Sequence, residues 1–335
     1  MKKTSIGGQA VIEGIMMKGP HKTALAVRIP DGSIDIEYIT EKHLKDKCAF
    51  FGLPIIRGVV NFVESMITGY GALMKSADKS GFTDLDDAEN VDNSNSENTV
   101  ANPNETAVAP DEAKAKMWDK IMAVVMVVAS VLGVALGVIL FMYLPSLIFD
   151  LLNGAIKGAL TGWKAVIEGI LKMIIFLVYM VLVSKMKDIK RVFSYHGAEH
   201  KTIFCYEKGL ELNVENVRKQ SRFHPRCGTS FMILMLIVGI ILGVALTWCF
   251  PILQTPGYRV VWVLVKILML PFICGIGYEL LKWCGRHDNK LTRLIAAPGK
   301  AMQRLTTNEP DDSMIEVAIA SLKAVLPDNP EEDNW

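Results

Sequence analysis

The 335-residue sequence has no paired-cysteine motif. Its six cysteines are scattered, none of them as Cys-x-x-Cys, and several lie in or beside apolar segments. This pattern is typical of reduced thiols in a reducing compartment, and it argues against a fold held together by disulfides.

An excess of charge of one sign is also missing. The 36 Lys and Arg residues nearly balance the 35 Asp and Glu residues, which leaves a formal net charge of +1. No basic stripe with interleaved aromatic residues is present, so we expect no nucleic-acid partner. The first residues form no apolar run, so we expect no cleavable signal peptide.

Apolar residues, in contrast, are abundant. They make up 51% of the sequence, and the mean hydropathy is +0.30. A chain this apolar and still this charged is expected to be part integral membrane protein and part cytosolic protein. Four segments reach the ~20 residues that cross a bilayer. They are residues 121–144, 163–184, 229–250 and 258–283.

The basic residues predict the orientation of these spans. Ten Lys and Arg residues lie between the second and third spans, in residues 185–228. Because basic loops stay on the cytoplasmic side, we expect that loop and both termini to be cytoplasmic, in a multi-pass protein of the inner membrane. The lipid bilayer is then one partner, and another membrane protein or a second copy of the chain stays open as a further partner.

The region before the first span divides into two parts. In residues 1–78, alternating strands at 24–29 and 34–39 flank Pro30-Asp31-Gly32, which predicts a β-hairpin, with residues 5–20 as a neighbouring strand. An amphipathic helix is expected over residues 54–74. Residues 79–113 are rich in Asp, Asn, Ser and Glu, which predicts a disordered linker.

The remaining segments complete the expected fold. Residues 114–184 would hold spans one and two, 185–228 a cytosolic His/Cys segment, and 229–284 spans three and four. Residues 285–335 would form a C-terminal cytosolic helical segment, with a helix starting near Asp312 or Ser313. The predicted fold class is mainly α: a four-helix transmembrane bundle with a small α+β cytosolic domain. That domain would be assembled from the N-terminus, the loop between spans two and three, and the C-terminus.

The segment Tyr195-His-Gly-Ala-Glu-His-Lys201 carries the chemistry. On a helix, His196 and His200 lie one turn apart and Glu199 lies on the same flank. The spacing His-x-x-Glu-His is the inverzincin signature, in which two His bind zinc and the Glu activates a water molecule. The competing interpretation is a set of solvated helix residues below a membrane span.

The sequence leaves the third ligand open. His224, Cys227, Glu207 or a carboxylate from elsewhere could supply it. Three protein ligands with an open position would make a catalytic zinc site, whereas four would make a structural one.

Five further residues are candidates for function. Glu13 is an acid among apolar neighbours, and Arg57 and Glu64 lie on the polar flank of the predicted amphipathic helix, which either faces the His site or is simply solvated. Arg226 belongs to the basic loop. Glu279 lies in the last turns of the fourth span, where an acid either faces a polar interior with a partner or reaches the cytosolic interface.

Four segments together resemble a known family. They are residues 7–17 (Gly-Gly-Gln-Ala-Val-Ile-Glu-Gly-Ile-Met-Met), 195–207, 224–231 (His-Pro-Arg-Cys-Gly-Thr-Ser-Phe) and 303–310. They are similar to the hallmark segments of the YqhQ-like family of bacterial membrane proteins, whose function is unknown. The resemblance covers nearly the whole chain and implies a metal-dependent enzyme with no established reaction.

Two hypotheses follow. In the first, the chain is a hydrolase: a divalent metal, zinc, is held by His196 and His200 with His224 or Cys227, and Glu199 is the general base. The substrate would be a membrane-proximal amide, ester or phosphoester. In the second, the cluster is a structural metal site or a polar network in a scaffold that binds another protein.

Overall fold

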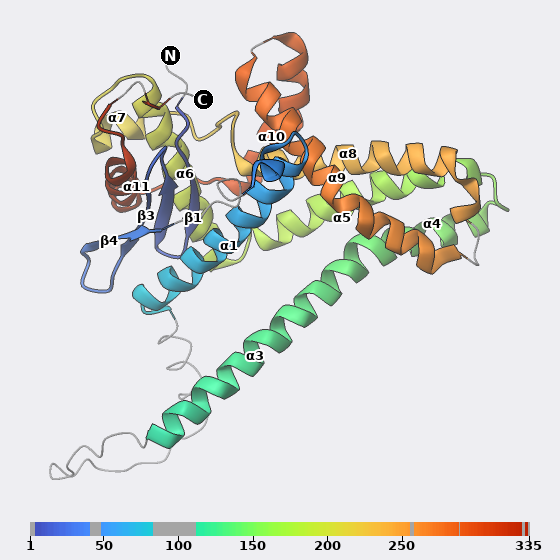
Figure 1. Cartoon of the computed structure of the whole chain (residues 1–335), viewed down its shortest axis with the longest axis horizontal. Coiled ribbons are helices and arrows are strands. Elements are labelled where there is room, and N and C mark those ends of the chain that lie inside the picture. Colours follow the sequence, from blue (N-terminus) through green and yellow to red (C-terminus); the bar gives the residue numbers. More distant parts are fainter. Residues whose placement is uncertain are drawn as a thin grey trace. The chain divides into compact units, whose positions relative to one another are not determined.

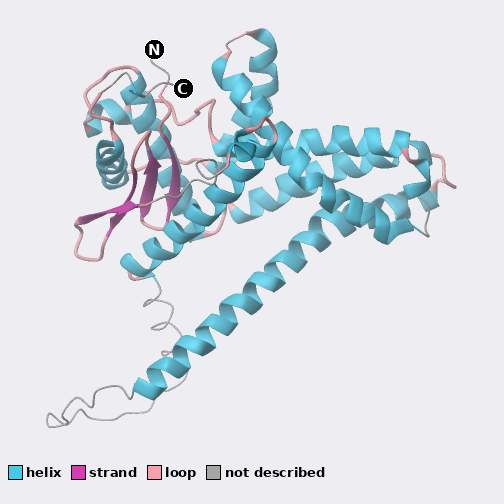
Figure 2. Ribbon diagram, viewed as in Figure 1, coloured by secondary structure: helices cyan, strands magenta, loops and turns pink. Residues whose placement is uncertain are grey.

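The computed structural model describes residues 4–40, 48–82, 112–254, 258–287, 289–329 and 332–333. These residues are mainly helical and include one small antiparallel sheet (Figure 2). The chain divides into two compact units, of which the first comprises Met1–Asp86 with Leu177–Trp335 and the second Asp87–Phe176. The residues of interest all lie in the first unit.

The sheet is a meander of four strands in the order β1-β2-β3-β4. The predicted hairpin is confirmed as β3 and β4, and its turn uses Gly32 at a φ of 86° while the Ser33 N–H donates to Asp31 at 2.8 Å. The Gly-rich segment before it forms two strands where one was expected. The bounds are Gly7–Val11 (β1), Gly14–Lys18 (β2), Thr23–Arg28 (β3) and Ile34–Ile39 (β4).

Helices cover both faces of the sheet (Figure 1). The predicted amphipathic helix is α1 (Ile56–Lys79), which packs on the face that presents Val11, Leu25 and Val27. The other face packs on α6 (Lys187–Glu207) and α11 (Asp312–Val325). Because side chains alternate along a strand, each face can bury its own apolar set. Helix α6 lies over β1 and β2, and α11 lies over β2, β3 and β4.

Helix α11 begins at Asp312, as its sequence predicted. The Asp311 side chain caps it by accepting the Met314 N–H at 2.9 Å. Its apolar face, with Ile315, Ala318 and Leu322 fully buried, fills the core between the sheet and α6. Burial of one such large aliphatic side chain stabilises the fold by roughly 1.5–3 kcal/mol.

Among the described residues, four helical segments are long and apolar enough to cross a membrane, the number predicted from the sequence, although the first ends at Ala155 and not near residue 144. Helices α8 (Gly228–Cys249) and α9 (Arg259–Arg286) pack against each other in the first unit. The other two candidate spans fall wholly or mostly in the second unit. The first candidate joins α3 (Glu112–Val138), a π-helical turn (Ile139–Tyr143) and α4 (Leu144–Ala155), and the second contains α5 (Lys164–Val183). The candidate spans are Val127–Ala155, Thr161–Val183, Gly228–Cys249 and Leu264–Arg286.

The C-terminal segment contains a helix that was not expected as a separate element. Helix α10 (Lys290–Thr306) starts with a capping box between Asn289 and Thr292. It packs on α8 (Gly228–Cys249) and on α9 (Arg259–Arg286). Its last residue, Thr306, reaches the candidate site. The linker predicted over residues 79–113 lies almost entirely outside the described residues, between the end of α1 and the start of α3.

Candidate metal centre

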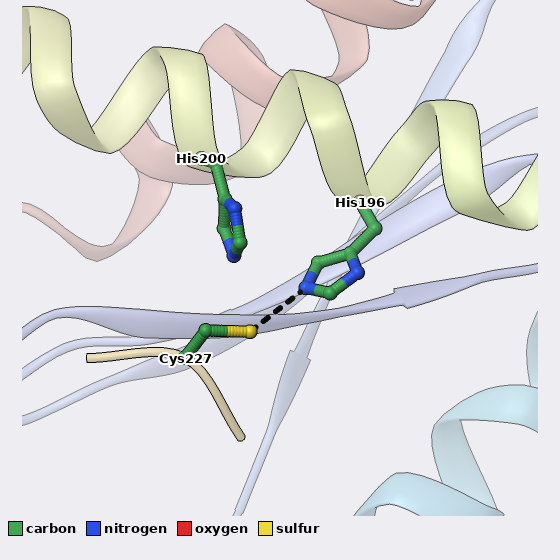
Figure 3. Close-up of side chains that lie close together, drawn as sticks. All are labelled: His196, His200 and Cys227. Carbon is green, nitrogen blue, oxygen red and sulfur yellow. Dashed lines mark hydrogen bonds between the residues drawn. The ribbon is translucent and has the colours of Figure 1, made fainter. Parts of the chain in front are cut away.

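His196, His200 and Cys227 converge on one point (Figure 3). The two imidazoles project from the same flank of α6, and Cys227 is the N-cap residue of α8. One potential ligand atom from each residue lies within 4.8 Å of the others. The helical spacing therefore places the His pair, and a segment 31 positions further along the chain adds a thiol.

Two backbone carbonyls determine which nitrogen of each imidazole carries a proton. His196 Nδ1 lies 2.8 Å from the Thr306 carbonyl oxygen, and His200 Nδ1 lies 2.5 Å from the Arg222 carbonyl oxygen. A carbonyl can only accept a hydrogen bond, so each Nδ1 must be the donor. In a neutral imidazole the Nε2 atom then carries the lone pair, which is the form that binds a metal.

Both Nε2 atoms face the cluster. His196 Nε2 lies 3.2 Å from Cys227 Sγ. His200 is 1% exposed, and its Nε2 atom has no hydrogen-bond partner in the part of the chain that the structure describes. A buried lone pair without a donor costs free energy, so such an atom calls for an explanation.

The surroundings of Cys227 favour its thiolate form. Burial opposes ionisation, but the imidazoles of His196 and His200 outweigh it and hold the pKa of Cys227 well below its ordinary value of 9.0. The Thr229 backbone N–H also points at Sγ from 3.4 Å, at the start of α8. Conversely, burial opposes a charge on His196, yet the neighbouring thiolate raises the pKa of His196 to about 9.

Glu199 lies against the first strand of the sheet. Its side chain is 4% exposed, and burial raises its pKa although the two imidazoles act in the opposite direction. It accepts a hydrogen bond from the Gly8 backbone N–H, while its Oε2 atom has no partner among the described residues. Gly8 is required here because a Cβ would come within 2.9 Å of the Met16 carbonyl oxygen and 3.0 Å of the Glu199 carboxyl carbon.

Three other candidates form a separate, supporting network. Glu207 accepts hydrogen bonds from Arg226 and from the Thr4 N–H, and His224 Nε2 lies 3.5 Å from it. Burial opposes ionisation of Glu207, but His224 and Arg226 hold its pKa below the ordinary value. Gln303 fixes the loop by bonding both the N–H and the C=O of His224, at 2.8 and 2.6 Å. Of the ligands left open by the sequence, Cys227 is the one that joins the His pair.

The remaining candidates lie elsewhere. Arg57 and Glu279 bind each other through two hydrogen bonds of 2.6 and 2.5 Å, which join α1 to α9. Glu13 lies in the turn between β1 and β2 with a φ of 50° and binds Arg191 on α6. Glu64 is half-buried on α1. None of these four contributes an atom to the described ligand cluster.

Comparison with known proteins identifies the family. The family model "Protein of unknown function (DUF1385)" matches residues 53–328, a range that includes the whole His/Cys cluster. The chain belongs to this family. A curated relative, "Uncharacterized protein YqhQ" of Bacillus subtilis (strain 168), is 33% identical over 323 residues, which is 96% of this chain and 92% of the relative. The expected membership of the YqhQ-like family is thus confirmed. No solved structure matches the chain.

In this DUF1385 chain, the donor set could hold a zinc ion. Two imidazole nitrogens and a thiolate are ligands of zinc, typically at about 2.0–2.3 Å. Three such ligands would leave one position open for water or substrate. A buried carboxylate on the same helix, with one free oxygen, could act on a molecule in that position.

Proposed function

We propose that this chain is a membrane-bound, metal-dependent hydrolase of the zinc type. His196, His200 and Cys227 would hold the ion, and Glu199 would act as general base. The proposal rests above all on the two imidazoles, whose Nδ1 protons are committed to backbone carbonyls so that both Nε2 atoms face Cys227 Sγ. Among the described residues no group donates a hydrogen bond to the buried His200 Nε2 atom, which is what an ion ligand would require.

The chemistry needs an activated water and a base. A divalent ion held by this donor set supplies a bound water of lowered pKa and polarises the substrate carbonyl. Glu199 takes the proton, and its raised pKa brings it closer to the neutral range in which a base is most effective. The Thr306 and Arg222 carbonyls keep the imidazoles in the binding orientation, as second-layer partners of metal ligands commonly do.

We further propose that the site faces the cytosol at the membrane surface. The support is the set of ten basic residues between the second and third spans, a segment that includes α6 and the Cys227 loop. The ligand Cys227 directly precedes the candidate span Gly228–Cys249. The site would therefore act on groups presented close to the lipid headgroups.

The test is the metal content of the purified full-length protein. We expect about one zinc per chain in the wild type and a large loss in His200→Ala, since two protein ligands seldom retain zinc. Glu199→Gln should keep the metal, because a base contacts the water and not the ion, but it should abolish function in cells. His21→Ala is the matched control, because His21 is exposed and bonded only to Glu332 among the contacts described.

Each result separates the alternatives. If His200→Ala and Glu199→Gln both retain full metal and full function in cells, the hydrolase proposal fails and a scaffold remains. Loss of metal in Glu199→Gln would make Glu199 a ligand and would close the site. Thermal unfolding with added zinc gives a second readout, because a ligand at 100 times its Kd stabilises the folded state by about 2.7 kcal/mol.

A further inference from the structure

The first strand of the sheet has an outer edge beside the candidate site. In the sheet order β1-β2-β3-β4, no described strand pairs with the far side of β1. Strand β1 pairs with β2 in the register Val11↔Gly14, Ala10↔Ile15, Gln9↔Met16 and Gly8↔Met17. An exposed strand edge offers a row of backbone donors and acceptors to another chain.

The register tells which residues point outward. In a hairpin with a two-residue loop, the pair next to the loop is hydrogen-bonded, and bonded and non-bonded pairs then alternate. Val11 and Gln9 therefore bond to β2, whereas Gly8 and Ala10 direct their N–H and C=O groups away from it. The hydrogen bond from the Gly8 N–H to Glu199 agrees with this assignment.

The candidate metal ligands lie on the same side of α6 as this edge. Helix α6 covers β1 and β2, and α11 packs on it from the side of β3 and β4. Tyr195, Ala198 and Cys205 fill the core between them. On a helix of 3.6 residues per turn, His196 and His200 lie well away from that core stripe, and Glu199 lies between the two. The helix thus presents Glu199 to the edge of β1 and the imidazoles just beyond it.

The exposed backbone of β1 lies next to the buried side chains of the candidate site. Gly7, Gly8 and Gln9 are exposed, whereas Glu199 and His200 are 4% and 1% exposed and each keeps one side-chain atom without a hydrogen-bond partner among the described residues. The Gly7-Gly8 pair carries no side chains that would block an approaching strand. A substrate group that runs along β1 would come close to Glu199, whose carboxyl carbon would lie 3.0 Å from a Cβ at Gly8.

We propose that the outer edge of β1 binds an extended polypeptide segment by strand pairing and presents one of its amide bonds to the candidate metal centre. This inference rests on the proposed hydrolase and names its substrate class. Pairing through main-chain hydrogen bonds is an established way to bind extended peptides. The Gly8 carbonyl and the Ala10 N–H and carbonyl would supply these bonds.

The electrostatics favour an amide over a phosphoester. Four cations of α6 and the loop after it are paired with carboxylates: Arg191 with Glu13, Arg226 with Glu207, Lys201 with Glu309, and Arg218 with Asp312. Recognition of a phosphate commonly uses Arg or Lys side chains that are available to it. A neutral peptide backbone instead needs alternating donors and acceptors, and the strand edge provides them.

The reaction balances with water as the only co-substrate. A water molecule gives a proton to the Glu199 carboxylate while its oxygen bonds to the amide carbon. Glu199 then passes that proton to the amide nitrogen, and the C–N bond breaks. The products are a carboxylic acid and an amine, which exchange the second proton of the water to become a carboxylate and an ammonium, and Glu199 returns to its starting state.

The test uses the full-length protein in detergent with the Glu199→Gln substitution, so that a bound peptide is not consumed. Dye-labelled β-casein, an unfolded polypeptide, serves as the probe, and its binding is measured by fluorescence anisotropy. Ala10→Pro removes the outward N–H while the β1–β2 hydrogen bonds remain, and proline is tolerated at strand edges. We expect binding to weaken by about tenfold, which corresponds to ~1.4 kcal/mol.

Tyr38→Pro is the matched control at the opposite edge of the sheet. In the β3–β4 register, the Ile29 N–H bonds to the Ser33 carbonyl, and the same alternation directs the N–H of Tyr38 outward. The protein with Glu199→Gln and Tyr38→Pro should bind casein as tightly as the protein with Glu199→Gln alone. The zinc content should be the same in these two proteins and in the Ala10→Pro variant. Equal binding by Ala10→Pro and Tyr38→Pro overturns the proposal.

If Ala10→Pro does not fold, methylated probes decide. Two casein-derived peptides are N-methylated on alternate residues, the first on the odd-numbered and the second on the even-numbered residues, so that each lacks the N–H groups along one edge. Strand pairing on one edge predicts that one peptide binds and the other does not, and equal behaviour of the two overturns the proposal. If the wild-type protein is purified without zinc but binds casein, and Ala10→Pro weakens that binding, the hydrolase proposal is refuted and strand pairing stands. Zinc-loaded protein without casein binding would refute strand pairing alone.

Discussion

Replacement of Gly197 by alanine should destabilise the protein, although alanine normally favours a helix. Gly197 lies in α6 between His196 and Glu199, and the segment joining α10 to α11 crosses it. A Cβ at this position would lie 2.0 Å from the carbonyl oxygen of Asn308, whereas real Cβ contacts essentially never fall below 3.0 Å. The helix and the crossing segment would have to separate by about 1 Å.

The crossing segment has little freedom to move. The Asn308 N–H donates to the Phe193 carbonyl at 2.9 Å, and its side-chain amide donates to the Lys190 carbonyl at 3.1 Å. Overpacking of this kind costs roughly 1–3 kcal/mol, more than the roughly 0.5–1 kcal/mol that alanine gains over glycine in a helix. The same displacement would pull the Thr306 carbonyl away from His196, so metal affinity should fall too.

Thermal unfolding in detergent and zinc content measure both effects. The control is Gly71→Ala in α1, where no atom lies within 4 Å of an added Cβ and the substitution should stabilise the protein by roughly 0.5–1 kcal/mol. We expect the change in unfolding free energy to have opposite signs for the two substitutions. A Gly197→Ala protein as stable as the wild type would refute the close crossing and the link from this segment to His196.

Three further predictions concern topology, acid stability and helix docking. A cysteine introduced at Lys208 should react with a membrane-impermeant thiol reagent only after the cells are permeabilised, whereas the exposed Cys249 should react in intact cells. Labelling of both cysteines from the same side of the membrane would refute the proposed orientation. The pKa of Glu207 lies below its ordinary value of 4.5, so its ionised form stabilises the fold above that pH and the contribution is lost as the pH falls through the folded-state pKa. Glu207→Gln should therefore be less stable at neutral pH and flatten the acid side of the stability profile measured by thermal unfolding. Arg57→Lys keeps the charge but not the two-pronged bond to Glu279, and should cost about 1 kcal/mol; a double-mutant cycle with Glu279→Gln that shows no coupling would contradict the pairing.

Local patterns account for what the sequence could predict. Hydrophobic alternation and the Pro30-Asp31-Gly32 turn were enough for the β3–β4 hairpin, and long apolar runs were enough for the four candidate spans. The acids near Asp312 marked the start of α11. On α6, helical spacing alone placed His196 and His200 side by side, because residues four apart share one flank.

Contacts between distant segments account for what it could not. Helix α10 contains Pro298 followed by Gly299, a pair that normally marks a turn. The helix continues through it, and Gly299 lies so close to α8 that a Cβ would come within 2.6 Å of Ser230. The choice of Cys227 over His224 depends on Gln303, which fixes the loop from another helix. The carbonyls of Thr306 and Arg222 have no sequence signature at all, since every residue has one.

The bonds between the two ends of the chain bear on the order in which this protein can be made. The Thr4 hydroxyl donates to the Asp333 carboxylate, and the Thr4 N–H donates to Glu207. The sheet is translated first, but α6 and α11, which cover one of its faces, are separated from it by two and four candidate spans. The sheet must therefore wait, with that face uncovered, until the ribosome has released the last helix. A ribosome that stalls within the spans would leave a sheet without its core, and the three candidate ligands could not be held in place. The arrangement thus limits any activity of the site to chains that have been translated through α11.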